Sequence, residues 1–313
     1  MKDHDIAGAV LKVCAAYQIQ GTSADLLQNL ERHSKASQPR SKSQQGRSVE
    51  EDMALQETLK LLFNLAHLFP ALAEAFCVTI SPIFDILKHE RITPSTPLQP
   101  PTAQLINALT ALEPALTNSD QLCAEADLLD GTDSLLQLLD ASVRAYSAEE
   151  LNQHVGPLIL LLRRIYPTSP ASVQSSMRAK LLPADEERGK PLGKSDTLFS
   201  RLMQLSMSSF TPAFRDSIAG LMFELSDKDV DSFVKNVGYG FASGFLVNNG
   251  IPLGSGLDSN AHGLADSGSQ PTQRSVNPVT GQFVDKEAVD EVPPMTDEEK
   301  EREAERLFVL FER

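Results

Sequence analysis

Leu62-Phe63-Asn64-Leu65-Ala66 is the stretch that decides the fold, because the chain repeats its pattern. A second copy reads Leu105-Ile106-Asn107-Ala108-Leu109, again with one polar residue among apolar ones. Two looser copies read Leu161-Leu162-Arg163-Arg164-Ile165 and Leu221-Met222-Phe223-Glu224-Leu225. The polar residues of successive copies are 43, 56 and 61 positions apart. Self-similarity at such intervals indicates one helical unit used several times.

The spacing of the copies indicates the kind of repeat. Armadillo and HEAT units have a period of about 40 to 47 residues, which the first interval matches, and loop insertions account for the longer intervals. We therefore predict an all-α fold, an armadillo/HEAT-like right-handed solenoid with an extended, partly irregular tail that ends in an amphipathic helix. A solenoid presents a long concave surface to another macromolecule. The expected function is accordingly binding rather than chemistry in a pocket.

The composition of the chain favours the same fold class and excludes several partners. Its 313 residues are 41% hydrophobic, which suffices for a core. The absence of tryptophan and the 6% share of aromatic residues suit stacked helices better than a β-sandwich or barrel. The net charge of −14 argues against a nucleic-acid partner and disfavours anionic membrane surfaces.

The cysteines and the apolar runs indicate a compartment. Cys14, Cys77 and Cys123 are far apart and odd in number, so we expect each to pack as a small apolar residue rather than in a disulfide. That pattern favours a reducing environment. The N-terminus has no signal-peptide pattern, and the run from Pro157 to Ile165 is too short to cross a bilayer. We expect a soluble, cytoplasmic monomer without membrane insertion.

Changes in composition divide the chain into four expected parts. Residues 1–49 hold a helix and a polar linker, residues 50–247 the helical repeats, residues 248–294 a flexible or extended tail, and residues 295–313 a C-terminal amphipathic helix. That last helix begins with a capping box at Thr296 and Glu299. The helices expected before it cover residues 6–31, 50–87 with breaks at Pro70 and Pro82, 102–115, 131–146, 151–166, 196–207, 212–225 and 229–237.

Polar residues recur at helical spacing within the repeats and are candidates for a binding groove. The sets that share this spacing are Gln56, Lys60, Asn64 and His67; Gln104 and Asn107; and Arg201, Gln204 and Ser208. At about 3.6 residues per turn, each set occupies one face of its helix. Such side chains would line the inner groove of a solenoid and bond a bound peptide. The alternative is that they form the solvated face of surface helices.

Motifs for covalent chemistry are weak. Residues 189–195 (GKPLGKS) resemble a phosphate-binding loop but have three residues between the glycines where the motif needs four, and no strand precedes them. Residues 238–244 (GYGFASG) have the wrong spacing for a dinucleotide turn. The six histidines lack metal-ligand spacing, and no nucleophile turn is present. We predict no enzyme activity, no metal and no cofactor.

Several motifs follow one another in a fixed order along the chain. They are Glu57–Leu65 (ETLKLLFNL), Leu181–Pro183 (LLP), Arg201–Met203 (RLM), Phe233–Gly244 (FVKNVGYGFASG), Ser275–Gly281 (SVNPVTG) and the acidic helix from Pro294. In this order they resemble the synembryn family of guanine-nucleotide exchange factors and folding chaperones. The resemblance covers about residues 50–313, and residues 1–49 match poorly. Here the chain begins well inside the family's usual length, so the first repeats are expected to be missing. Leu257 to Gln273 also lacks the acidic Ser/Thr block of animal members, so phosphorylation control is not expected.

The resemblance implies a partner, the α subunit (Gα) of a heterotrimeric G protein. Its C-terminal helix would lie in the concave groove, the tail would contact its nucleotide-binding domain, and GDP would be released by binding alone, at the inner plasma membrane where Gα recruits the protein. The groove residues implied are Asn64, His67, Asn107, Arg163, Arg201, Gln204 and Lys235, and the tail residues are Asn277, Pro278, Val279, Thr280 and Gly281. Two alternatives stay open. The tail segment would be a turn packed on its own solenoid, or the protein would be a non-catalytic helical-repeat scaffold or adaptor that binds peptides.

Overall fold

The computed structural model describes residues 21–38, 47–112, 124–207, 212–252, 276–277 and 279–287, together with Arg302. Several sequence-based expectations therefore lie outside the described residues. They concern residues 6–20, the polar linker, Cys14, Cys123, Ser208, Pro278, most of the tail and the C-terminal helix with Thr296 and Glu299. Cys77 is described, and it is buried and free, as expected of a small apolar residue.

The described chain is mostly helical. Its helices are residues 21–37, α2 (Val49–Leu68), η1 (Pro70–Thr79), α3 (Ile80–His89), α4 (Thr102–Ala111), α6 (Glu125–Ala145), α7 (Ala148–His154), α8 (Gly156–Ile165), η2 (Tyr166–Thr168), α9 (Ala171–Leu181), η3 (Glu187–Gly189), α10 (Leu198–Ser206), α11 (Pro212–Leu225), α12 (Val230–Val237), α13 (Tyr239–Asn248) and η4 (Val284–Lys286). Within the described residues no strand forms, and β pairing is limited to a bridge between Val276 and Phe283. The predicted all-α class is confirmed.

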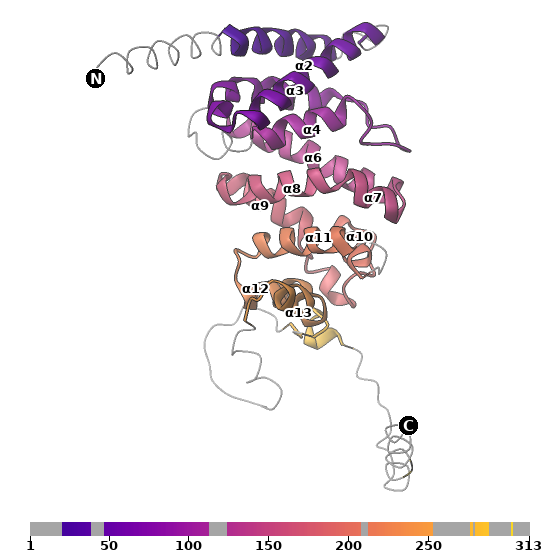
Figure 1. Ribbon diagram of the computed structural model, residues 1–313. Helices are drawn as coiled ribbons and strands as arrows, with labels where there is room; N and C mark the ends of the chain where they lie inside the picture. The colour runs from indigo at the N-terminus through magenta and orange to yellow at the C-terminus, as the bar shows by residue number, and fades with distance from the viewer. Residues whose placement is uncertain are drawn as a thin grey trace, which may run out of the picture.

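The helices form an elongated stack of two rows. In one row α2, α4, α8, α11 and α13 pack on one another in succession, and in the other α3, α6 and α9 do so. Contacts of α3 with α4, of α6 with α8 and of α9 with α11 join the rows, while α10 and α12 pack against α11. Figure 1 shows the stack running from α2 at one end to α13 at the other. Each layer contacts mainly its neighbours, which is the arrangement of an α-solenoid.

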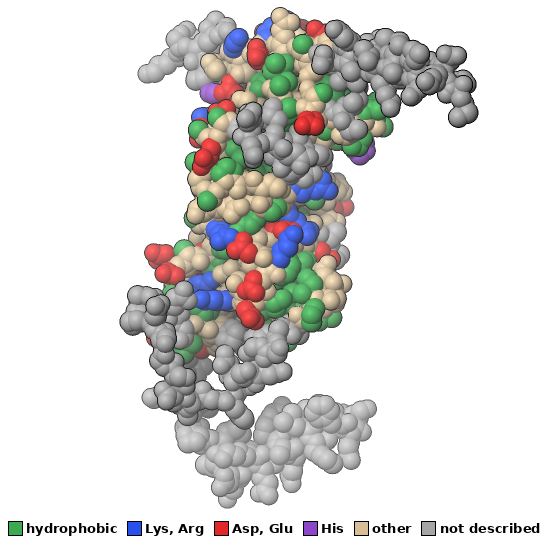
Figure 2. Space-filling view, turned by 90° about the vertical axis from the view of Figure 1, so that its left-hand side faces the viewer, with side chains coloured by type: hydrophobic (Ala, Val, Ile, Leu, Met, Phe, Trp, Pro, Cys, Tyr) green, Lys and Arg blue, Asp and Glu red, His purple; other side chains and the backbone are tan. Residues whose placement is uncertain are grey.

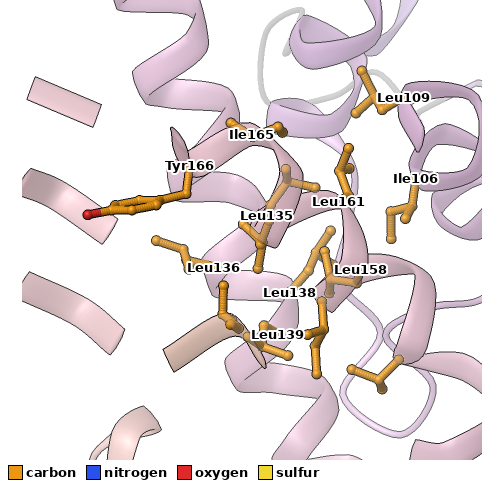
Figure 3. Packing of buried hydrophobic residues seen from close by; sticks show 14 of the residues in the cluster. Ile106, Leu109, Leu135, Leu136, Leu138, Leu139, Leu158, Leu161, Ile165 and Tyr166 are labelled. Atoms are coloured by element: carbon orange, nitrogen blue, oxygen red, sulfur yellow. The ribbon is translucent and has the colours of Figure 1, made fainter. Parts of the chain in front are cut away.

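The core follows the repeated leucine phrase. Leu62, Leu105, Leu161 and Leu221 occupy matching places in the four copies, and all are fully buried. Figure 3 shows side chains of α4, α6 and α8 meeting in one apolar layer. Burial of each such side chain contributes about 1.5–3 kcal/mol. The layer is therefore held by the same residues that identify the repeat.

Two expectations about where helices begin and end are wrong. Pro82 does not break a helix, because it lies in the first turn of α3, where a backbone N–H has no partner within the helix. The helix expected to start at Gly131 starts at Glu125 instead. Gly131 therefore lies inside α6. A side chain at this position would overlap the ring of Phe84 on α3, which explains why the residue is glycine. The glycine permits close packing of α3 and α6.

Helices α9 and α13 are absent from the expected set. Serine, glutamine and lysine dilute the apolar pattern of α9, and Gly240 and Gly244 lower the helix propensity of α13. Packing compensates for the weak local signal. Val173 and Met177 of α9 and Leu246 of α13 are buried in the common core.

Candidate functional site

The four marker residues of the repeated phrase lie on one row of the stack. Asn64 is on α2, Asn107 on α4, Arg163 on α8 and Glu224 on α11, and these helices pack in that order. Asn64 is exposed, Asn107 and Arg163 are half-buried, and Glu224 is buried. The row thus carries a line of polar groups whose exposure decreases toward α11.

The marker residues of the last two copies, Arg163 and Glu224, contact each other between α8 and α11. Arg163 Nε lies 3.4 Å from Glu224 Oε1, and Lys228 Nζ lies 3.3 Å from the other carboxylate oxygen. Gly220 makes room for this pair, because a Cβ there would be 2.7 Å from Arg163 Nη1. With 40% of its side chain exposed, Arg163 remains accessible to a second carboxylate.

A second polar cluster lies beside this pair, where α11 ends. The Tyr166 hydroxyl accepts a bond from Arg178 Nε at 2.5 Å and donates to Asp227 Oδ1 at 3.2 Å. Arg178 Nη2 also pairs with Asp227 at 2.5 Å. Burial raises the pKa of the Tyr166 hydroxyl, which keeps it protonated as a donor. Figure 2 shows basic and acidic side chains mixed over the middle of one face of the stack.

Arg201 and Gln204 lie on α10, outside the row of markers. Arg201 bonds Asp140 of α6 and Asp196, and only 15% of its side chain is exposed. Gln204 Nε2 donates to the carbonyl of Gly193 at 2.5 Å. These contacts hold the loop before α10 against the helix. The structure does not bring either residue to Asn64, Asn107 or Arg163.

The remaining groove candidates lie near the two ends of the stack. His67 is exposed on α2 and stacks on Phe63 with the ring centroids 5.4 Å apart. Lys235 is exposed in the last turn of α12, and its backbone carbonyl accepts a bond from Arg188. These two residues are on opposite ends of the chain's helical part (Figure 1).

The tail residues form a tight turn with its own hydrogen bonds. Asn277 Oδ1 accepts from the Val279 N–H, and the Asn277 carbonyl accepts from the Gly281 N–H, both at 2.8 Å. Asn277 Nδ2 and the Thr280 hydroxyl both donate to Glu287, at 2.7 and 2.6 Å. These two bonds lower the pKa of Glu287. The turn and the residues up to Glu287 therefore behave as one unit.

This turn is docked on the end of the stack through Arg188. Its Nη1 donates to the carbonyls of Gly281 at 3.1 Å and Lys235 at 2.8 Å, and its Nη2 donates to Asn236 Oδ1 at 3.2 Å. The Arg188 carbonyl accepts from the Phe283 N–H at 2.8 Å. Sequence reasoning missed Arg188, since it lies in a charged loop where no pattern separates it from its neighbours.

Two glycines make the docking possible. Gly238 has a φ of 83°, and a Cβ there would approach the Val279 carbonyl oxygen to 3.1 Å. Gly281 has a φ of 69°, and a Cβ there would overlap Leu192. The docked turn fits the alternative given above for this segment, a turn packed on its own solenoid. Val279 and Thr280 remain exposed on its outer side.

Two pockets of the described chain are lined by residues other than the predicted site residues. Their volumes are about 490 and 340 Å³. Within the described residues, no group of three or more His, Cys, Asp or Glu side chains suits a metal ion. No described helix is long and apolar enough to cross a membrane. The polar surfaces can hold another macromolecule by hydrogen bonds and ion pairs.

Comparison with known proteins gives one consistent result. Residues 10–313 match the family model Ric8, described as guanine nucleotide exchange factor synembryn. The chain is 27% identical over 188 residues to the chaperone Ric-8A of Xenopus tropicalis, covering 59% of this chain and 34% of that protein. It is 24% identical over 284 residues to a synembryn-like chaperone of Schizosaccharomyces pombe, covering 85% of this chain and 52% of that protein. The chain thus spans about a third to a half of the length of these relatives.

Proposed function

The chain belongs to the synembryn family of guanine nucleotide exchange factors, and from this premise we propose that it binds a heterotrimeric Gα subunit. The partner's C-terminal helix lies along the α2–α4–α8–α11 row, and the docked tail turn makes a second contact. Binding promotes release of GDP, in keeping with the family description as an exchange factor, and assists folding of Gα, in keeping with the relatives' names as chaperones. The protein acts as a cytoplasmic monomer without a cofactor and reaches the membrane through Gα.

The observation that carries this proposal is the alignment of the markers. Asn64, Asn107 and Arg163 lie on three successive helices of one row, and we propose that one elongated ligand lies along this row. Amide side chains offer both a donor and an acceptor to a helix end or an extended peptide. A cation at Arg163 suits a carboxylate on the ligand. Together these groups favour a polar peptide with an acidic end.

Exchange in this scheme follows from differential affinity and needs no bond chemistry. A protein that holds nucleotide-free Gα more tightly than GDP-bound Gα must by linkage weaken GDP binding by the same factor. A hundredfold preference corresponds to about 2.7 kcal/mol. Incoming GTP then favours the other state of Gα and releases the complex.

The predicted groove residues have different roles in the proposed complex. Asn64, His67 and Asn107 bond the backbone of the bound helix, and Arg163 pairs with a carboxylate in competition with Glu224. Arg201 and Gln204 contribute by holding the loop before α10, because their polar atoms bond Asp140, Asp196 and Gly193. Lys235 lies beside the docked tail turn and assists the second contact.

The test is release of fluorescent GDP from purified Gα with and without an excess of this chain. We expect faster release and a nucleotide-free complex that dissociates when GTP is added. If neither the acceleration nor the complex is observed, this chain is not an exchange factor. Capture of Gα without faster release would favour the alternative, a non-catalytic scaffold that binds peptides.

A further inference from the structure

Arg188 is an unusual cation in this protein. It is 6% exposed, and no carboxylate among the described residues bonds to its guanidinium. Burial lowers the pKa of Arg188, and the nearby charges of Asp185 and Glu187 act in the opposite direction. A buried charge is costly unless it is well compensated. The groups that bond the Arg188 guanidinium are therefore expected to compensate its buried charge.

Those partners are oxygen atoms of two separate parts of the chain. Lys235 and Asn236 belong to the last turn of α12, where the helix dipole is negative and favours a cation. The Gly281 carbonyl belongs to the tail turn, 93 residues along the chain from Arg188. A planar guanidinium can bond several acceptors in fixed directions, whereas a lysine presents one nitrogen.

The loop that carries Arg188 is itself held firmly. Its neighbour Glu187 is buried and accepts bonds from the Thr197 hydroxyl and, at 3.0 Å, from the Ser200 hydroxyl of α10. The backbone of Arg188 adds the bond from Phe283, whose side chain is buried. The guanidinium is thus presented from a rigid base.

We propose that Arg188 is a positioning residue that clasps the turn around Gly281 to the end of α12 and so fixes the place of residues 279–287 on the stack. The turn lies on a surface formed by Arg188, Gly189, Asn236 and Gly238, which we call the tail dock. Gln282 Nε2 donates to the Gly189 carbonyl at 3.4 Å, and Gly238 provides space for Val279 and Gly281. Without the clasp, the turn retains its internal bonds to Glu287 but loses its fixed place.

The first experiment measures amide hydrogen exchange in the free protein, so it does not depend on any partner. In Arg188→Leu we expect the N–H group of Phe283, which donates to the Arg188 carbonyl, to exchange about tenfold faster or more, with amides of α8 unchanged. Arg188→Lys should recover only part of the protection. Arg144→Leu is the matched control, because this exposed arginine pairs with Asp140 on the outside of α6. Unchanged protection of Phe283 in a folded Arg188→Leu protein would overturn the clasp.

A second variant covers the case in which Arg188→Leu does not fold. Gly281→Ala leaves every residue of the stack in place but creates an overlap with Leu192 and a strained φ. We expect the same local loss of protection at Phe283 with the melting temperature of the stack little changed. If Phe283 stays protected, the turn is not held at the tail dock.

The functional consequence rests on the proposed function and is measured separately. We expect Arg188→Leu to reduce acceleration of GDP release at least fivefold while leaving capture of a Gα C-terminal peptide unchanged. A purely structural residue would change both or neither. If the protein without any substitution does not accelerate GDP release, the proposed function fails. The amide hydrogen exchange experiment then still tests the clasp by itself.

Discussion

Gly238 and Gly281 lie against each other in the tail dock. A Cβ added at Gly238 would be 3.6 Å from the Gly281 nitrogen, and one added at Gly281 would be 3.7 Å from the Gly238 nitrogen. Both residues are in the left-handed region of φ. Two segments that the sequence separates by more than 40 residues therefore approach each other through their backbones, and the positive φ of both residues favours glycine at this contact.

This contact predicts opposite effects for two nearby glycines. Gly238→Ala should lower the free energy of unfolding by about 1–2 kcal/mol, because alanine is strained at this φ and would crowd the Val279 carbonyl. Gly240→Ala should be neutral or stabilising by up to about 1 kcal/mol, because no atom lies within 4 Å of the added Cβ and the residue is helical. Urea unfolding of both variants measures the difference. Equal effects would contradict the role of Gly238.

The end of α11 predicts a stabilising substitution. Asp227 and Lys228 have φ values of 57° and 58°, which cost free energy for residues with a Cβ. Lys228→Gly should stabilise the protein by about 0.5–1 kcal/mol, since the Lys228 side chain is 61% exposed and its ion pair with Glu224 is therefore weak. Lys228→Ala loses the same pair and keeps the strain, so it serves as the control. A glycine variant no more stable than the alanine variant would refute this expectation.

His33 predicts a loss of stability in mild acid. It is 3% exposed, and its pKa lies below 6.5 because of burial first and then of the charges of Arg32 and Arg47. As the pH falls through about 6.5, the unfolded chain takes up a proton that the folded chain does not, so the free energy of unfolding decreases. His33→Gln should reduce the decrease between pH 7 and pH 5. Thermal melts across this range measure it, and identical pH profiles would exclude His33 as the source.

The groove assignment is tested best at Arg163. Arg163→Glu should weaken capture of a Gα C-terminal peptide about tenfold or more, because it replaces the exposed cation of the row with an anion next to Glu224. Arg144→Glu on α6 is the control for the added negative charge. Arg201→Glu is less informative, because only 15% of the Arg201 side chain is exposed, against 40% for Arg163, and the substitution would disturb the contacts to Asp140 and Asp196. Unchanged affinity of Arg163→Glu would remove the row from the binding site.

The apolar layer is tested by two neighbouring leucines. Leu161→Ala should destabilise the protein by about 2–5 kcal/mol, since its side chain is fully buried in the layer of Figure 3. Leu160→Ala should have a small effect, because Leu160 is 38% exposed on the same helix. Both substitutions replace leucine with alanine in α8. The difference between the two losses of stability therefore measures packing and not helix propensity. Comparable losses would mean that the layer does not carry the stability of the repeat.

The sequence by itself determined most of the helices and their repetition. Leu62, Leu105 and Leu161 recur in a helical pattern that needs only local periodicity and burial to be read, and the markers beside them fall on one row because the unit is the same each time. The limits at Gly131 and Pro82 were misread, since their outcome depends on a ring of α3 and on the position within a first turn.

Only the tertiary structure decided the role of Arg188 and the place of the tail turn. Their contact joins residues 93 positions apart, and most of its acceptors are backbone carbonyls. A carbonyl is present at every residue, so no side-chain pattern along the chain indicates which of them a buried cation will meet. That choice is made when α12 ends at Gly238 and the stack brings the charged loop beside it.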